Sequence, residues 1–108
     1  MGIDLKLYAG RPPGHPKRPV TLIRDWGDPA DNLARALGRL GGDRRLAAID
    51  PYGDTLYNEQ QAAAALAEMA QLQGLCATDG EREAVRALRD MLAECARTAG
   101  SYLMFVGD

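Results

Sequence analysis

The chain has 108 residues, of which 46% are apolar and 26% are charged, and this composition suits one domain with a core of its own. The net charge is −2, but residues 1–24 carry five Lys and Arg against one Asp, so the remainder of the chain is acidic. This balance gives no support to general nucleic-acid binding, which needs a concentrated basic face.

Membrane and secretion signals are not visible in the sequence. No stretch approaches the roughly 18 apolar residues that span a bilayer, and the first residues lack a basic-then-apolar signal pattern. Cys76 and Cys95 are the two cysteines, and their separation is typical of free thiols in a reducing compartment. With His15 as the single histidine, no zinc-ligand spacing emerges. We therefore expect a cytoplasmic protein without a metal or cofactor.

The N-terminal part of the chain predicts two strands joined by a loop. Apolar and polar side chains alternate over residues 3–8, which is the period-two signal of a half-buried strand. Residues 11–19 hold four prolines, which remove backbone donors and predict a solvated, partly polyproline-like loop. A β-branched run then predicts a second strand over residues 20–25, at the edge of a sheet.

Helix signals follow the second strand. Asp28 is suited to cap a helix and Pro29 to its first position, so a helix is predicted over residues 29–40, before the stop at Gly41. Residues 45–50, with the sequence "RLAAID", predict a short third strand.

The second half of the chain predicts two long helices and a final strand. Residues 58–74 are rich in Ala, and these small side chains allow a neighbour to approach closely. Residues 78–100 begin with Thr78 and Glu81 in capping-box spacing and carry one apolar stripe. Residues 101–108 form an unbroken apolar run, which favours a central strand covered on both faces.

These elements predict a single α+β domain over residues 1–108. Their order is strand, strand, helix, strand, helix, helix, strand. We expect a mainly antiparallel sheet of about four strands, with two long helices and one shorter helix on one or both of its faces.

The segment "DPYGDTLYNEQQ", residues 50–61, is interpreted as a turn followed by a helix start. Asp-Pro and Tyr-Gly-Asp are typical of turns. Asn58 is suited to cap the helix, and the Gln61 side chain can accept a hydrogen bond from the Asn58 amide. A competing interpretation places a divalent cation between Asp50 and Asp54, since paired carboxylates bind hard cations.

We predict no catalytic residue, because neither a nucleophile with its base nor a phosphate-binding loop is recognisable. Tyrosines and carboxylates near one turn, together with the end of the last strand, predict an acidic rim that suits a basic protein partner. Trp26, just before a helix start, either fills the end of the sheet or is an interface anchor. The predicted partner-binding residues are Trp26, Asp50, Tyr52, Asp54, Tyr57 and Asp108.

The motifs "YGDTLYNEQQ" and "YLMFVGD" resemble those of small uncharacterised actinobacterial proteins that combine a YGDT…N…Q turn with a C-terminal GD. That group has no assigned chemistry, so the resemblance implies no catalytic residue. In size, acidity and α+β build, the chain also looks like immunity proteins of bacterial toxin systems, an analogy of class.

Three functional hypotheses follow. The leading one is a non-enzymatic cytoplasmic protein-binding domain of immunity type, which masks a toxin or another basic partner. The second is a small cation-dependent enzyme or ligand-binding domain that uses Asp50 and Asp54, with Asp108 as a further ligand. The third is a homodimeric structural protein whose Ala-rich helix packs on its twin, so both monomer and homodimer stay open.

Overall fold

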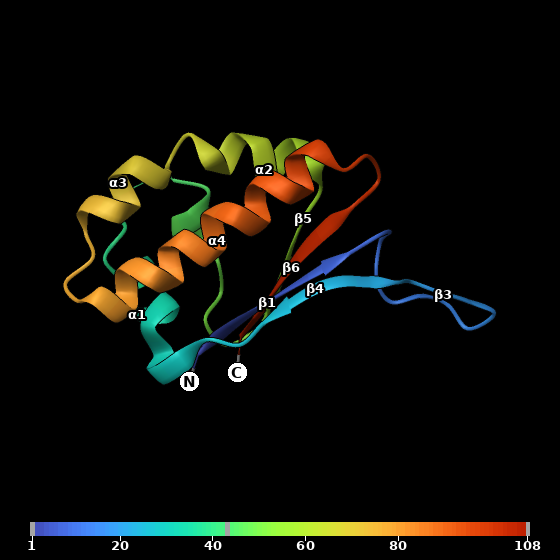
Figure 1. Ribbon diagram of the computed structural model, residues 1–108, viewed down its shortest axis with the longest axis horizontal. Helices are drawn as coiled ribbons and strands as arrows, with labels where there is room; N and C mark the ends of the chain where they lie inside the picture. The colour runs from blue at the N-terminus through green and yellow to red at the C-terminus, as the bar shows by residue number, and fades with distance from the viewer. Residues whose placement is uncertain (1, 43, 108) are drawn as a thin grey trace.

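The computed structural model describes residues 2–42 and 44–107, and its centre is one antiparallel sheet in the strand order β4–β1–β6–β5 (Figure 1). The four strands are β1 (Ile3–Tyr8), β4 (Leu22–Trp26), β5 (Asp54–Tyr57) and β6 (Tyr102–Gly107). β1 and β6 are the two central strands and pair along their whole lengths, from Ile3 opposite Gly107 to Tyr8 opposite Tyr102. The predicted α+β class and its four-stranded antiparallel sheet are confirmed.

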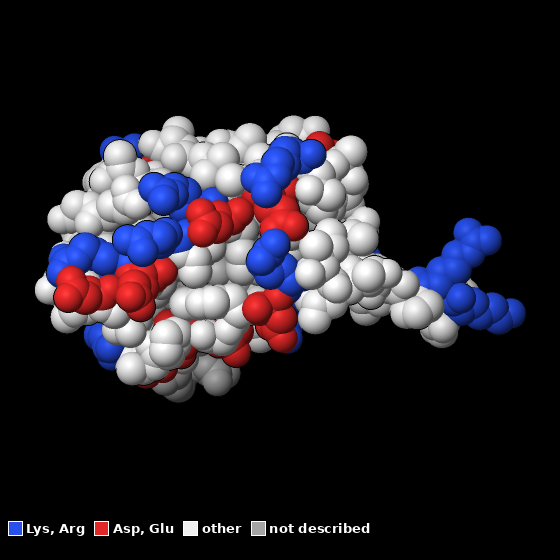
Figure 2. All heavy atoms as spheres, viewed as in Figure 1, with Lys and Arg blue, Asp and Glu red and all other residues white. Residues whose placement is uncertain are grey.

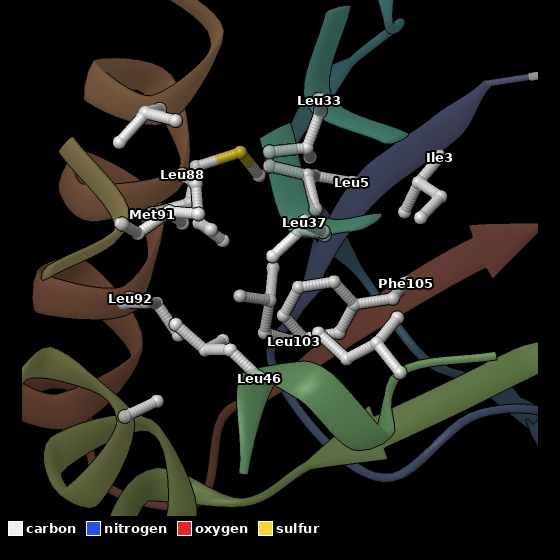
Figure 3. Close-up of a cluster of buried hydrophobic side chains, with 14 of the residues drawn as sticks. Ile3, Leu5, Leu33, Leu37, Leu46, Leu88, Met91, Leu92, Leu103 and Phe105 are labelled. Atoms are coloured by element: carbon white, nitrogen blue, oxygen red, sulfur yellow. The ribbon is translucent and has the colours of Figure 1, made fainter. Parts of the chain in front are cut away.

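All of the α-helices lie on one side of this sheet (Figure 1). They are α1 (Asn32–Gly38), α2 (Glu59–Leu66), α3 (Met69–Gly74) and α4 (Asp79–Arg97). The long helix α4 carries the apolar stripe that its periodicity predicts, and Leu88, Met91 and Leu92 of that stripe are buried. In Figure 3 these side chains point toward Leu5 and Phe105 of the sheet, so the core lies between the sheet and the helical layer.

The period-two pattern of the strands makes the sheet two-faced. Leu5 and Leu7 of β1 are fully buried against the helices, whereas Lys6 between them is half-buried on the other side. β6 follows the same pattern, with Phe105 buried and Met104 half-exposed. The prediction that the last strand is covered on both faces is therefore wrong: β6 is central in the sheet, but the helices cover one of its faces.

The predicted third strand at residues 45–50 is also wrong. Residues Leu46–Ala48 form one turn of 3₁₀ helix, η2. The next strand of the main sheet after β4 is β5 (Asp54–Tyr57). The cause is a contact from far along the chain. The Glu68 carboxylate accepts hydrogen bonds at 2.9 Å from the backbone amides of Arg45 and Leu46, which satisfies them at the start of a helical turn.

The same carboxylate interrupts the helix predicted over residues 58–74. α2 ends at Leu66 and α3 begins at Met69, and Glu68 lies in the break between them. Ala62 and Ala65 of α2 are fully buried in the core, and α2 packs closely along α4. The small side chains of the Ala-rich segment thus allow two helices of this chain to approach each other.

The helix predicted from Pro29 begins at Asn32 instead, after a 3₁₀ turn, η1 (Pro29–Asp31). Ala30 has a φ of 52°, in the left-handed region, so a continuous α-helix cannot start at Pro29. The Asp28 carboxylate still caps the helix, since it accepts hydrogen bonds from the amides of Leu33 at 2.8 Å and Ala34 at 3.1 Å. It also accepts one from the amide of Ile3 at 3.0 Å, which ties α1 to β1.

Residues 11–19, predicted as a polyproline-like loop, belong instead to a projecting hairpin. β2 (Gly14–His15) pairs with β3 (Arg18–Pro19) in a separate two-stranded sheet that extends beyond the main sheet (Figure 1). The amide of Ala9 donates to the carbonyl of Thr21 at 2.8 Å and closes the base of the hairpin. We call residues 10–20 the arm.

Two helix starts follow the predicted capping chemistry. At α2 the Asn58 side chain accepts from the Gln61 amide and the Gln61 side chain accepts from the Asn58 amide, both at 2.8 Å. At α4 Thr78 accepts from the Glu81 amide at 3.1 Å, and the Glu81 carboxylate accepts from the Ala77 amide at 3.1 Å and from the guanidinium of Arg39. The Arg39 hydrogen bond holds the pKa of Glu81 below its usual range and joins the end of α1 to the start of α4.

Asn58→Ala is expected to lower the free energy of unfolding by about 1 kcal/mol, because the Gln61 amide loses its acceptor. Gln60→Ala, at an exposed position of the same helical turn, serves as the matched control and should change stability by less than about 0.5 kcal/mol. Urea denaturation measures both, and equal losses in the two variants would show that the cap does not stabilise α2.

Glu81→Gln tests the contact between α1 and α4 through its pH dependence. Because the folded-state pKa of Glu81 is depressed, its carboxylate stabilises the fold above its unfolded pKa of about 4.3, and this contribution is lost as the pH falls through the lower folded pKa. We expect the melting temperature of the variant to lie below that of the wild type at neutral pH and to converge with it in acid. Exposed Glu83→Gln is the control; a constant gap between variant and wild type down to about pH 3 would contradict the assignment.

Candidate interaction site

The side of the sheet opposite the helices is the largest candidate surface. We call it the uncovered face, because none of the described helices packs against it (Figure 1). Its side chains are half-exposed or exposed and alternate along the strands with the core residues; they are Asp4, Lys6, Tyr8, Asp25, Asp54, Leu56, Tyr102, Met104 and Val106. The antiparallel register places Leu56, Met104 and Lys6 side by side across three strands.

The outward side chains of β6 on the uncovered face are apolar. Tyr102, Met104 and Val106 follow one another along the strand, and Tyr8 of β1 and Leu56 of β5 lie beside them, so these side chains form one strip along β6. Antiparallel sheets with one solvated face usually carry polar residues there. A contiguous apolar strip on an exposed face is typical of a surface that meets another molecule.

A groove of about 510 Å³ crosses this face beside the arm. Its residues come from both parts of the chain: Tyr8 and Met104 belong to the sheet, and Pro12, Pro13 and Val20 belong to the arm. Asp54 also borders the groove, at the start of β5. The arm therefore forms a wall of an otherwise flat sheet surface, and a carboxylate marks the groove's other end.

Carboxylates surround the apolar strip. Asp25 pairs with Lys6 at 3.4 Å, and Asp4 accepts a hydrogen bond from the backbone amide of Asp28 at 2.8 Å. Asp54 is exposed and forms no ion pair with any residue between 2–42 or 44–107. Asp4, Asp25 and Asp54 outnumber Lys6 and Arg11, whose guanidinium lies over the Tyr102 ring, so the uncovered face has a small negative net charge.

The turn at residues 50–53 lies at the end of the sheet beside α1, since Pro51 and Tyr52 line a hollow with Ala34 and Arg35. The Gly107 amide donates to the Gly53 carbonyl at 2.8 Å, which places the turn beside the end of β6. The Asp50 carboxylate accepts from the Tyr52 amide at 2.8 Å, as an Asx turn does, and the Tyr52 side chain is 68% exposed. The structure thus brings Asp50, Tyr52 and Asp54 together at one end of the sheet, while predicted Asp108 lies outside the described residues.

Tyr57 does not belong to this surface, which corrects the sequence prediction. Its side chain is 4% exposed, and its ring meets that of Phe105 edge-on with 4.9 Å between centroids. The hydroxyl donates to the carbonyl of Arg45 at 3.0 Å, and burial raises the pKa of Tyr57 far above its usual value. Strand alternation explains the placement, because Asp54 and Leu56 point to the opposite side from Tyr57.

Trp26 is separated from the turn. It lies opposite Leu5 in the register, so its ring is on the helical side of the edge strand β4, where it is half-buried. A small pocket there is lined by Trp26 together with Ala87 and Met91 of α4. The ring therefore packs at the margin of the core, on the other face of the sheet from Asp54.

Sequence reasoning missed the apolar residues of the uncovered face. Tyr102, Met104 and Val106 belong to the unbroken apolar run that predicted a strand covered on both faces. The residues opposite them on β1 indicate that these side chains lie on the uncovered face. Met104 lies opposite Lys6 and Val106 opposite Asp4, and these charged partners require that this side of the sheet meet solvent or another molecule.

The cysteines and carboxylates bear on the cation hypothesis. Cys76 is half-buried and Cys95 is buried, both are free, and burial raises the pKa of each thiol. Among residues 2–42 and 44–107, no three His, Cys, Asp or Glu side chains gather where they would hold a metal ion. The predicted pair Asp50 and Asp54 thus offers two carboxylates, one of which already accepts the Tyr52 amide.

Comparison with protein-family models, with curated proteins and with solved structures finds no match to this chain. Within the described parts of the chain, no helix is both long enough and apolar enough to cross a membrane. The fold and the site therefore define the class by themselves: a small α+β domain with one helical layer and an acidic, partly apolar sheet face.

Asp50→Ala and Asp54→Ala should separate a turn-forming carboxylate from a surface carboxylate. We expect the first to lower the free energy of unfolding by roughly 0.5–1 kcal/mol, because the Tyr52 amide loses its acceptor. The second should leave it unchanged within about 0.5 kcal/mol. Guanidinium denaturation measures both, and a larger loss for Asp54→Ala would mean that Asp54 has a structural role.

Proposed function

We propose that the protein is a non-enzymatic domain that binds a protein partner on its uncovered face. The observation that carries this proposal is the half-exposed apolar strip around Met104, which runs along β6 where no described helix covers it. Leaving such a strip in water forgoes about 25 cal/mol for each Å² of apolar surface that a partner would bury.

The anatomy of the face supports a protein rather than a small molecule as the ligand. Protein interfaces combine an apolar centre, enriched in Tyr and Met, with a polar rim. Here Tyr8, Tyr102 and Met104 form the centre, and Asp4 and Asp54 lie at the rim. Rigid strands present these side chains, so little conformational entropy is lost when a partner binds.

The charge of the rim supports a basic partner. Asp54 forms no ion pair among the described residues, and Asp4 lies across β6 from it, opposite the same Val106. Facing carboxylates attract cations during encounter and disfavour acidic partners. An immunity-type protein that masks a basic toxin is the form of this function that we favour, and it would need no catalytic group of its own.

A pair of matched double variants tests the proposal. The face variant combines Asp54→Lys with Met104→Lys and alters the uncovered face alone. The control variant combines Arg86→Glu with Arg89→Glu, two exposed positions on α4, on the helical side of the molecule. Circular dichroism verifies that both remain folded.

We expect the wild type and the control variant to retain the same basic protein in stoichiometric amounts when each is immobilised and exposed to an extract of the native host. The face variant should bind that protein at least about 100-fold more weakly, because charge reversal and an added buried charge act together. Titration of the purified partner by calorimetry measures the affinities. Equal affinity for the face variant, or no stoichiometric partner for the wild type, would refute the proposal.

A further inference from the structure

The arm is the least supported part of the described chain. Its hairpin consists of two residue pairs, Gly14 opposite Pro19 and His15 opposite Arg18, and residues 13–19 are all exposed. The arm projects from the body and accounts for much of the 44 Å length of the molecule, which measures 26 Å and 22 Å in its other directions (Figure 1). An isolated two-stranded hairpin is marginally stable in water, so the arm gains order when another surface supports it.

The arm is also the most basic part of the chain. From Leu5 to Arg24 the sequence contains no acidic residue, and the arm itself carries Arg11, Lys17 and Arg18. Figure 2 shows Lys and Arg side chains at its far end, well away from the mixed charges of the body. The Arg11 guanidinium lies 5.9 Å from the centre of the Tyr102 ring, so the base of the arm rests over the uncovered face while the tip extends past it.

Arm and face are complementary in charge. The tip presents cations and the uncovered face presents carboxylates, but the tip extends away from the face of its own chain. The groove lies between Tyr8 of β1 and Asp54 of β5, with Met104 of β6 between them.

We propose that two copies of this chain form a symmetric dimer in which the arm of each copy lies on the uncovered face of the other. Each copy offers one arm and one face, so a single two-fold axis forms both arm-to-face contacts, and no arm or face is left to bind a third copy. Lys17 and Arg18 of one copy meet the carboxylates around Asp54 of the other, and the neighbouring Pro16 and Pro19 cover the apolar strip.

This inference rests on the proposed function in one respect: the second copy occupies the face that the partner would bind. The dimer is then a stored form of the domain, in which the apolar strip is covered until a more strongly basic partner competes for it. Partner and second copy exclude each other, because both need the same carboxylates and the same apolar strip.

Charge-swapped variants test the dimer. The arm variant combines Lys17→Glu with Arg18→Glu, both at exposed positions, and is compared with the wild type, the face variant and the control variant. Sedimentation equilibrium gives the mass of each over a range up to about 0.5 mM protein, a range that covers weak dimers. We expect the wild type and the control to dimerise, and the arm and face variants to dissociate at least about 100-fold more readily.

Mixing supplies a positive test. The arm variant has acidic arms and an acidic face, and the face variant has basic arms and a more basic face, so each repels its own kind. In an equimolar mixture both contacts become attractive, and we expect a heterodimer whose affinity returns to within about tenfold of that of the wild type. Raising the NaCl concentration from about 0.05 M to about 0.5 M should weaken both assemblies.

Three results would overturn the inference: a monomeric wild type at every concentration, an arm variant that dimerises as the wild type does, or no heterodimer in the mixture. The failure of the proposed function looks different. If the arm variant is monomeric but captures no partner on its intact uncovered face, the dimer stands and the proposed function falls. If the wild type is monomeric yet captures a basic partner through that face, the function stands and the dimer falls.

Discussion

The apolar contact between one face of the sheet and one helical layer is the constraint on which the rest of this structure depends. Leu5, Phe105 and Leu88 meet in that contact and are fully buried. Because every described α-helix lies on the same side, the other side of the sheet is covered only at the base of the arm among the described residues. The candidate interaction site is therefore a direct consequence of how the core is built: an open face is what remains when a small domain places all of its helices in one layer.

Carboxylates hold this layered arrangement together at its joints. Asp28 accepts hydrogen bonds from backbone amides of β1 and α1, and Glu68 accepts them from the amides at the start of η2. Glu81 pairs with Arg39 between α1 and α4. Each of these side chains bonds residues distant in sequence and so positions one segment against another. Asp54 differs, because its carboxylate is exposed on the uncovered face and holds no described segment in place. Some carboxylates of the chain thus stabilise the fold, and others are available to a partner.

The prediction from sequence succeeded where the decisive forces are local. The alternation in β1, the apolar stripe of α4 and the cap formed by Asn58 and Gln61 all depend on residues within a few positions of one another. It failed where a distant group intervenes. Without Glu68, the segment "RLAAID" has the composition of a short strand, and the helix that starts at Asn58 has no local reason to break at residue 67. The arm was missed for a different reason: its two short strands pair only with each other, and four prolines in this segment favour a loop over a strand.

By itself the sequence determined the α+β class, most of the elements in their order, and an acidic body joined to a basic N-terminal part. Only the tertiary structure decided which surfaces meet solvent: it buried Tyr57, placed Trp26 on the helical side, and left Met104 on the uncovered face. The physical reason is that periodicity sorts side chains into two faces of a strand, but cannot say whether a second layer covers each face. That depends on the packing of helices that lie far away in the chain, and it is this packing that created the candidate site.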